Sequence, residues 1–194
     1  MFRSSIKQVA TVAVTALVVG CAANSPSEEK SSSSGLPAWV IAPSGLVGEG
    51  ALVATECVPD NAGMSILKSK STALARAAIA QQIQVNVQVM DKTYQDLTEN
   101  GEESASGSTF SSVSKQVTDQ MLQGAIPQRM DYIEGRGEDL FCSMVVLAPE
   151  QNRKIFEAII QKSNRQMSPN NEALLYQEFR AKRAAEELDK AVGN

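Results

Sequence analysis

Apolar residues recur along the chain in two different periods, one typical of strands and one typical of helices. Residues 45–58 alternate small and apolar side chains, which predicts a strand or a pair of strands. Residues 63–82 are rich in Ala and carry Leu67, Leu74 and Ala78 on one stripe, which predicts a helix. The small side chains of this helix would let it lie close on a sheet.

Residues 83–89 change to a period of two. Their apolar side chains are separated by single amides, so we expect a strand with one face buried and the other in water. Such a strand is typical of an antiparallel or mixed sheet that is covered on one side. The apolar positions are Ile83, Val85, Val87 and Val89, and the amides are Gln84, Asn86 and Gln88.

The second half of the chain predicts a helix, a hairpin and another helix. A polar loop spans 99–108, and the apolar residues after it return at helical spacing. Residues 127–134 and 139–147 predict a hairpin, and its second strand is so continuously apolar that we expect it to be central. Pro149 would open the next helix. The two helical stripes are Phe110, Val113, Val117 and Met121, and then Ile155, Phe156, Ile159 and Ile160.

A final helix is predicted over 171–191. Its apolar residues would fall on one side, and two pairs of opposite charge stand four residues apart in the favourable order. Two interpretations are open: a solvated helix that packs loosely on the domain, or a docking helix for a partner or a second copy. The apolar residues are Leu174, Ala181, Ala185, Leu188 and Val192, and the pairs are Glu178 with Lys182 and Glu186 with Lys190.

The first 20 residues have the pattern of a bacterial secretory leader. Arg3 and Lys7 give it a basic start, and residues 9–20 are apolar or small and carry no charge. This stretch is too short to span a bilayer as a helix, which needs about 20 residues. We therefore expect it to be removed during export.

The leader ends at the run Leu17-Val18-Val19-Gly20-Cys21, which resembles a lipobox with Val18 where leucine is commoner. The run predicts cleavage before Cys21 and attachment of acyl chains, palmitate among them, to that cysteine. The alternative is an ordinary leader that is cut nearby, with Cys21 incidental. Ala22 resembles the sorting signal for the outer membrane. Several acyl chains would hold the protein there essentially permanently, facing the periplasm.

These patterns divide the chain into four parts. Residues 1–20 are the signal peptide, and 21–35 are the lipidated cysteine and a polar, flexible tether that has too little apolar surface to fold. Residues 36–165 form the globular domain, and 166–194 form a C-terminal helical extension. The expected fold class is α+β, with a small antiparallel or mixed sheet, helices packed mainly on one face, and the C-terminal helix.

Composition narrows the possible functions. The chain has 194 residues, of which 43% are apolar and 21% charged, as in globular proteins. Its net charge is −4, and loss of Arg3 and Lys7 with the leader would lower the charge further, so nucleic acid is not an expected partner. The absence of His removes the commonest general base and the commonest metal ligand.

Two cysteines, Cys57 and Cys142, remain besides the lipidation candidate. In an oxidising compartment such a pair could form a disulfide. The alternative is two buried free thiols, because the sequence cannot place the two Cα atoms at bonding distance.

The chain holds short motifs that resemble catalytic ones but lack their companions. Ser65 with Lys68 and Ser112 with Lys115 have the Ser-x-x-Lys spacing of penicillin-recognising enzymes, yet the Lys-Thr-Gly element is missing. Glu102 stands beside another Glu in a polar loop, where solvation is the expected role. No metal-ligand spacing occurs. We therefore predict no enzymatic activity, no cofactor, no metal site and no small-molecule substrate.

Several short motifs occur in an order that resembles the LPP-twenty family of bacterial outer-membrane lipoproteins. They are the Pro37-Ala38-Trp39-Val40 run, the Gly48-Glu49-Gly50 run, the Ala-rich helix and the alternating residues 83–89. The resemblance covers residues 36–148. It implies a small α+β domain on a membrane anchor, and some members of the family are parts of flagellar outer-membrane rings or assist flagellum assembly. It supplies no catalytic residue.

The leading hypothesis is a structural or assembly lipoprotein that works through protein–protein contacts, in a flagellar or envelope ring or as a homo-oligomer. The second is a periplasmic binding or activator module for a cell-wall enzyme or glycan. An enzyme of unknown type is the third. The anchor and the spare terminal helix favour the first.

Overall fold

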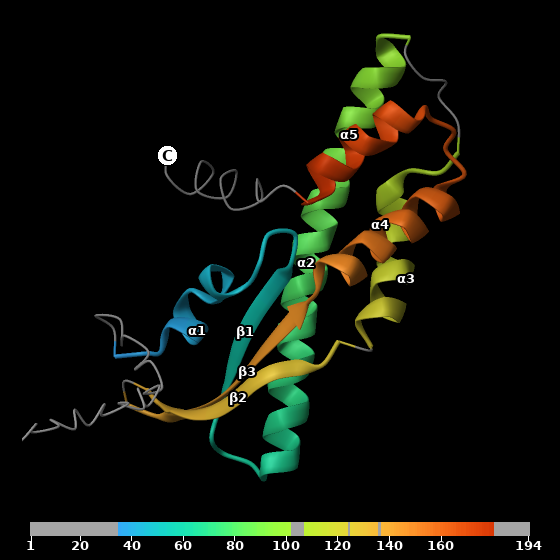
Figure 1. Ribbon diagram of the computed structural model, residues 1–194. Helices are drawn as coiled ribbons and strands as arrows, with labels where there is room; N and C mark the ends of the chain where they lie inside the picture. The colour runs from blue at the N-terminus through green and yellow to red at the C-terminus, as the bar shows by residue number, and fades with distance from the viewer. Residues whose placement is uncertain (1–34, 102–106, 124, 136, 181–194) are drawn as a thin grey trace, which may run out of the picture.

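One long helix organises the fold, which is described by a computed structural model for residues 35–101, 107–123, 125–135 and 137–180. This helix, α2 (Met64–Glu99), has 36 residues and is therefore about 54 Å long. The sheet crosses its N-terminal half, and α3, α4 and α5 gather along its C-terminal half (Figure 1).

The remaining elements follow the order of the chain. Before α2 come α1 (Ala38–Ile41), a short 3-10 helix η1 (Pro43–Leu46) and β1 (Leu52–Pro59). After it come α3 (Phe110–Leu122), β2 (Pro127–Glu134), β3 (Asp139–Leu147), α4 (Pro149–Ser163) and α5 (Pro169–Arg180). The predicted α+β class is confirmed. The first strand, predicted over 45–58, begins only at Leu52, because residues 45–46 belong to η1 and residues 47–51 form a bend and a turn.

The sheet is antiparallel with strand order β1-β3-β2. The predicted hairpin is confirmed at both of its strands, and β3 is central, as its continuous apolar run indicated. Side chains of β3 alternate between two faces. Phe141 and Val145 point toward α2, and Cys142 and Met144 point to the opposite face.

The strand predicted over 83–89 is wrong, because these residues continue α2. Alternation at i, i+2 and i+4 also contains the helical spacing i, i+4, and here Ile83 and Val87 are both fully buried on the core side. Val85, between them, is exposed. No Gly or Pro occurs within α2 to stop the helix, so it continues through Glu99.

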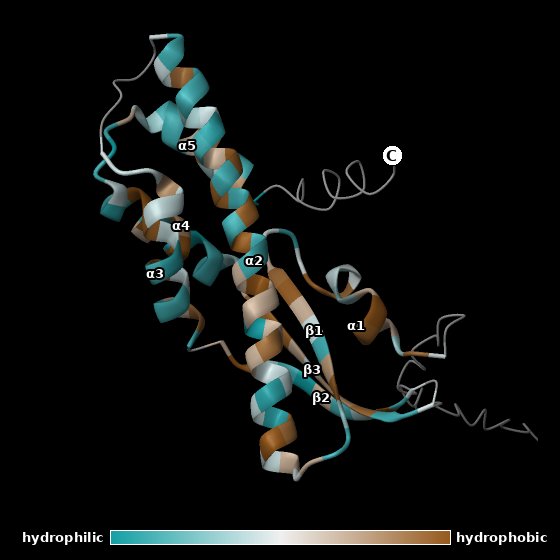
Figure 2. Ribbon diagram, turned by 180° about the vertical axis from the view of Figure 1, so that it is seen from behind, coloured by the Kyte–Doolittle hydropathy of each residue, from teal (hydrophilic) through white to brown (hydrophobic). Residues whose placement is uncertain are grey.

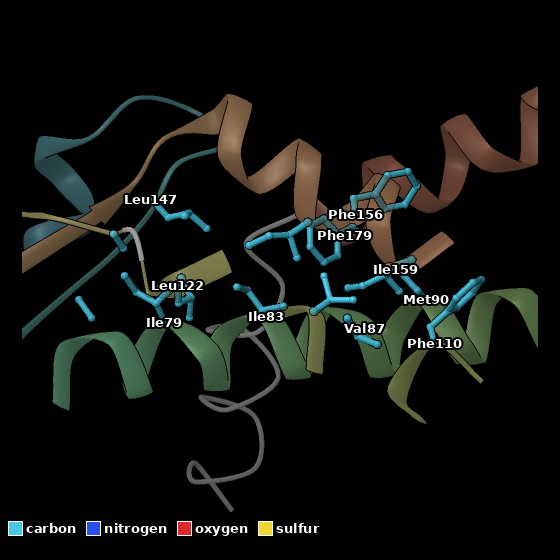
Figure 3. Close-up of a cluster of buried hydrophobic side chains, with 14 of the residues drawn as sticks. Ile79, Ile83, Val87, Met90, Phe110, Leu122, Leu147, Phe156, Ile159 and Phe179 are labelled. Carbon is cyan, nitrogen blue, oxygen red and sulfur yellow. The ribbon is translucent and has the colours of Figure 1, made fainter. Parts of the chain in front are cut away.

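The main core lies between α2 and the other elements (Figure 3). The apolar row of α2 faces side chains from α3, α4, α5 and the end of β3. Phe156 of α4 packs its ring against Tyr176 and Phe179 of α5, with ring centroids 5.0 and 5.6 Å apart. The α2 residues of this core are Ala75, Ile79, Ile83, Val87, Met90 and Tyr94.

A smaller core lies on the other face of the sheet, under α1. Trp39 is fully buried there against Cys142 and Ile133. The Thr55 hydroxyl donates a hydrogen bond of 2.6 Å to the Trp39 carbonyl, and the Arg129 guanidinium lies 4.8 Å from the centroid of the indole ring. Of the longer helices, α2 covers one face of the sheet, and α3 to α5 pack along α2 beyond the sheet. Only short helical turns lie on the other face among the described residues.

The described part of the predicted C-terminal helix, α5, is not loosely packed. Leu175 and Phe179 are fully buried in the main core, whereas Leu174 of the predicted stripe is 38% exposed. The core therefore continues past the boundary predicted at residue 165. The remaining predicted residues of this helix, with Lys182, lie outside the described residues.

Candidate protein interaction surface

The structure joins Cys57 and Cys142 in a disulfide, with the sulfur atoms 2.00 Å apart. The two residues stand directly opposite each other in β1 and β3, and their Cα atoms are 4.0 Å apart. The strand register therefore selects the bridge over the two free thiols that the sequence left open. Cys21, the lipidation candidate, lies outside the described residues.

The two Ser-x-x-Lys motifs lie on exposed helix surface. The hydroxyl of Ser112 donates a hydrogen bond of 2.7 Å to the Thr109 carbonyl, and the Ser112 N–H is capped by the Thr109 hydroxyl. Ser65 and Lys68 lie in the first turns of α2. Glu102 is outside the described residues.

A buried ionic cluster, which the sequence did not indicate, joins α2 to the start of α3. The Asp91 carboxylate accepts hydrogen bonds of 2.8 Å from the Phe110 and Ser111 N–H groups and forms a 3.0 Å ion pair with Arg165. The Arg165 guanidinium also lies 4.2 Å from the Tyr94 ring centroid and 4.3 Å from that of Phe110. Both charges are used inside the fold, so the cluster ties α2 to the start of α3 and to the segment that follows the end of α4.

Among the described residues, no group of three or more Cys, Asp or Glu side chains is placed to hold a metal ion. No helix in the described part of the chain combines the length and the apolar character needed to cross a membrane.

A groove of about 520 Å³ lies between α4 and α5. Arg153, on its wall, donates a 2.9 Å hydrogen bond to Glu157 and lies over the Tyr176 ring at 5.3 Å. The hydrogen bond to the Glu157 carboxylate, with its negative charge, raises the pKa of Arg153. Arg180, also on the wall, pairs with Glu49 at 2.9 Å. The groove is open to solvent, and charged side chains surround the ring of Tyr176 on its wall.

The longest exposed surface among the described residues is the side of α2 that faces away from the sheet. Figure 2, which is turned by 180° from Figure 1, shows α2 from this side. Ten residues on this side follow one another at spacings of three and four, and all ten are exposed. We name this set the outer row of α2. Its members are Ile66, Lys70, Ala73, Ala77, Gln81, Gln84, Gln88, Lys92, Gln95 and Glu99.

Three large apolar side chains on and beside the outer row are exposed. Ile66 is 61% exposed, and Leu74 and Val85, which flank the row, are 42% and 36% exposed. The opposite side of α2 is held by the sheet and by α3 and α5. The outer row is therefore presented on a rigid support, which favours recognition because little order is lost on binding.

The sequence pattern concealed the outer row because residues 83–89 read as a strand. Three members of the row, Gln81, Gln84 and Gln88, fall within or beside that stretch. Placing residues 64–99 on one continuous helix, as the structure does, is what brings the row together.

Comparisons with models of protein families, with curated proteins and with solved structures found no match for this chain.

Proposed function

We propose that this chain is an outer-membrane lipoprotein with a structural or assembly role, and that it works through protein contacts at the outer row of α2. The observation that carries the proposal is the outer row on its rigid support, with all ten members exposed in the described part of the chain and with exposed apolar neighbours. The leader and the lipobox at Cys21 support the anchor. The resemblance to the LPP-twenty family supports a place in a flagellar or envelope ring.

The exposed apolar side chains supply a driving force for such contacts. Burying the exposed part of Ile66, Leu74 or Val85 against a partner would contribute about 1 kcal/mol for each side chain. The amides and charges of the row would select the partner, because each needs a matching group when water is excluded. This combination is typical of a specific contact of moderate strength.

Anchoring strengthens moderate contacts. A tether of residues 22–35 would hold the domain at an average of about 20 Å from its lipidated end. Proteins confined in this way to one membrane meet at a high effective concentration, so weak contacts suffice for assembly. We infer that the short tether and the moderate contact surface act together.

The direct test is photo-crosslinking in cells that make the full chain. A photoreactive residue is placed at Ala77, in the middle of the outer row, and in a matched strain at Lys154, which is exposed on α4. We expect protein adducts at position 77 and few at 154, with masses that identify the partner. Equal labelling at the two positions, or no adduct at 77, would contradict the proposal.

A second candidate function is a periplasmic binding or activator module for a cell-wall enzyme or glycan. The specific observation in its favour is the groove between α4 and α5, where Tyr176 and Arg153 offer a ring face and a cation. Pull-down on purified peptidoglycan tests it. Retention that is lost in Tyr176→Ala would favour this function over the first.

A further inference from the structure

We propose that the outer row of α2 binds the same row of a second copy of this chain, with the two helices antiparallel and related by a two-fold axis between Gln81 and Gln84. The inference rests on the proposed function, because it takes the outer row as the contact surface, and it names the partner.

The spacing of the row fits this arrangement. Read from either end, its members recur at the same intervals of three and four residues, so an antiparallel copy brings each member opposite another member. In this register Gln81 lies opposite Gln84 of the second copy, and Ala77 opposite Gln88. Ala73 lies opposite Lys92, and Lys70 opposite Gln95.

The charges of the row favour the antiparallel direction. Lys70 is the cation near the start of the row, and Asp96 and Glu99 are acids near its end, all three exposed. An antiparallel copy places Lys70 within about one turn of both acids, whereas a parallel copy would place Lys70 against Lys70 and Glu99 against Glu99. The other cation of the row, Lys92, lies opposite Ala73 and therefore also about one turn from Lys70, on the side away from the acids. The two acids near Lys70 outnumber this one cation, so attraction exceeds repulsion in the antiparallel direction.

This charge order does not stabilise α2 itself. A helix is favoured by acids in its first turn and by bases in its last turn, and α2 has neither. Its exposed Lys68 and Lys70 lie near the N-terminus, and Asp96 and Glu99 lie near the C-terminus. An antiparallel second copy compensates for this disadvantage. The acidic C-terminal end of its α2 then lies beside the basic N-terminal end of the first α2.

The side chains at the centre of the row suit pairing with themselves. An amide both donates and accepts hydrogen bonds, so Gln81 of one copy can pair with Gln84 of the other without a charge mismatch. Ala77 leaves room for the longer Gln88 opposite it.

At each end of the row Ile66 lies opposite Glu99. Leu74 and Val85 flank the contact as its other large apolar side chains. The rest of the contact is small or polar, which fits a pair that forms when both copies are confined to one membrane.

The two-fold axis predicts which positions can be cross-linked. In the antiparallel pair, the two copies of residue 84 lie about one helical turn apart, whereas the two copies of residue 70 lie about 38 Å apart along the axis. Residue 70 of one copy lies instead beside residue 95 of the other. In a parallel pair, residue 70 would lie beside itself.

Oxidative cross-linking of the full chain tests this geometry, with single cysteines placed at exposed positions of the row. We expect Gln84→Cys to give a disulfide-linked dimer on its own. Lys70→Cys alone should give none, but differently tagged copies of Lys70→Cys and Gln95→Cys made together should link to each other. The parent chain is the control for cross-links through its own Cys21. Lys154→Cys, on the exposed surface of α4, is the control for cross-links that form by random collision.

Charge exchange gives a second readout. Lys70→Glu should weaken self-association about fivefold or more by replacing attraction to Asp96 and Glu99 with repulsion. Adding Glu99→Lys to the same chain should restore a large part of it. Circular dichroism of each variant should match the parent chain, because all these positions are exposed on the helix.

Some results would overturn the inference. Self-linking of Lys70→Cys would mean a parallel pair, and no dimer from Gln84→Cys would mean that the outer row does not meet itself. Photo-crosslinks at Ala77 to a different protein, together with no dimer, would overturn the inference and leave the proposed function intact. Absence of every adduct at Ala77 would remove both.

Discussion

At the scale of single residues, the cluster of Asp91 and Arg165 shows how a few polar groups fix the ends of helices. The carboxylate receives the first N–H groups of α3, a position where a negative charge is favoured by the helix dipole. The side chains of Arg165 and Asp91 are only 7% and 14% exposed. Removing Asp91 would therefore leave the Arg165 charge and the backbone donors of α3 unsatisfied in a poorly solvated place.

We predict that Asp91→Ala lowers the free energy of unfolding by about 3 kcal/mol, because the buried Arg165 loses its counter-ion. Urea unfolding followed by circular dichroism measures the change. Glu157→Ala is the matched control, since it breaks an exposed ion pair with Arg153 and should leave the free energy of unfolding nearly unchanged. Equal effects of the two substitutions would mean that the cluster does not anchor α3.

At the scale of elements, distant segments of the chain determine which face of each helix is buried. The sequence predicted a helix at the position of α5 but placed Leu174 on its buried side. In the structure Phe179 and Leu175 take that side, because they meet Phe156 and the apolar row of α2. The stripe was misplaced because the partners that cover it lie far away in the sequence.

The two faces of α5 give a direct comparison. We expect Phe179→Ala to lower the free energy of unfolding by about 3–4 kcal/mol, because it opens a cavity in the main core. Leu174→Ala should change it by less than about 1 kcal/mol, since Leu174 is half-exposed. Thermal unfolding of the two variants provides the measurement. A larger effect for Leu174 would contradict the packing of α5.

The sheet was predictable and the long helix was not, for a physical reason that residues 83–89 illustrate. The hairpin of β2 and β3 has its turn and its apolar run within 21 residues, so local sequence specifies it. The alternation of Ile83, Val85 and Val87 fits either element. Burial of Ile83 and Val87 against α3, α4 and α5 decides for the helix, and Val85 is left in water.

At the scale of the whole molecule, the sheet separates two cores, and the disulfide belongs to the smaller one with Trp39. The bridge joins residues 85 apart in sequence, so it removes many conformations from the unfolded chain. We therefore expect the disulfide to raise the free energy of unfolding of the whole domain.

Replacing both Cys57 and Cys142 by Ala should lower the free energy of unfolding by about 4–5 kcal/mol on the chain-entropy account. Denaturant unfolding of the parent chain with and without a reducing agent gives the same comparison without a mutation. The reducing agent should not change the double variant. An unchanged midpoint for the reduced parent would show that the bridge does not stabilise the fold.

The proposed lipid anchor also concerns the whole chain. We predict that Cys21→Ala moves the protein from the membrane fraction to the soluble fraction and abolishes incorporation of labelled palmitate, because acyl chains would supply the membrane affinity. Fractionation and labelling of cells that make each form measure both effects. Retention of Cys21→Ala in the membrane would mean that another segment holds the protein there.

The sequence by itself determined the α+β class, the hairpin, the helices that begin at Phe110 and Pro149, and the pattern of a lipoprotein leader. Each of these depends on residues that are close together in the chain, where period, turn and cap residues agree. The tertiary structure alone decided the conformation of residues 83–89, the pairing of Cys57 with Cys142, the buried side of α5 and the outer row of α2. These features depend on which distant segments cover a given face, and burial against such segments outweighs an ambiguous local pattern.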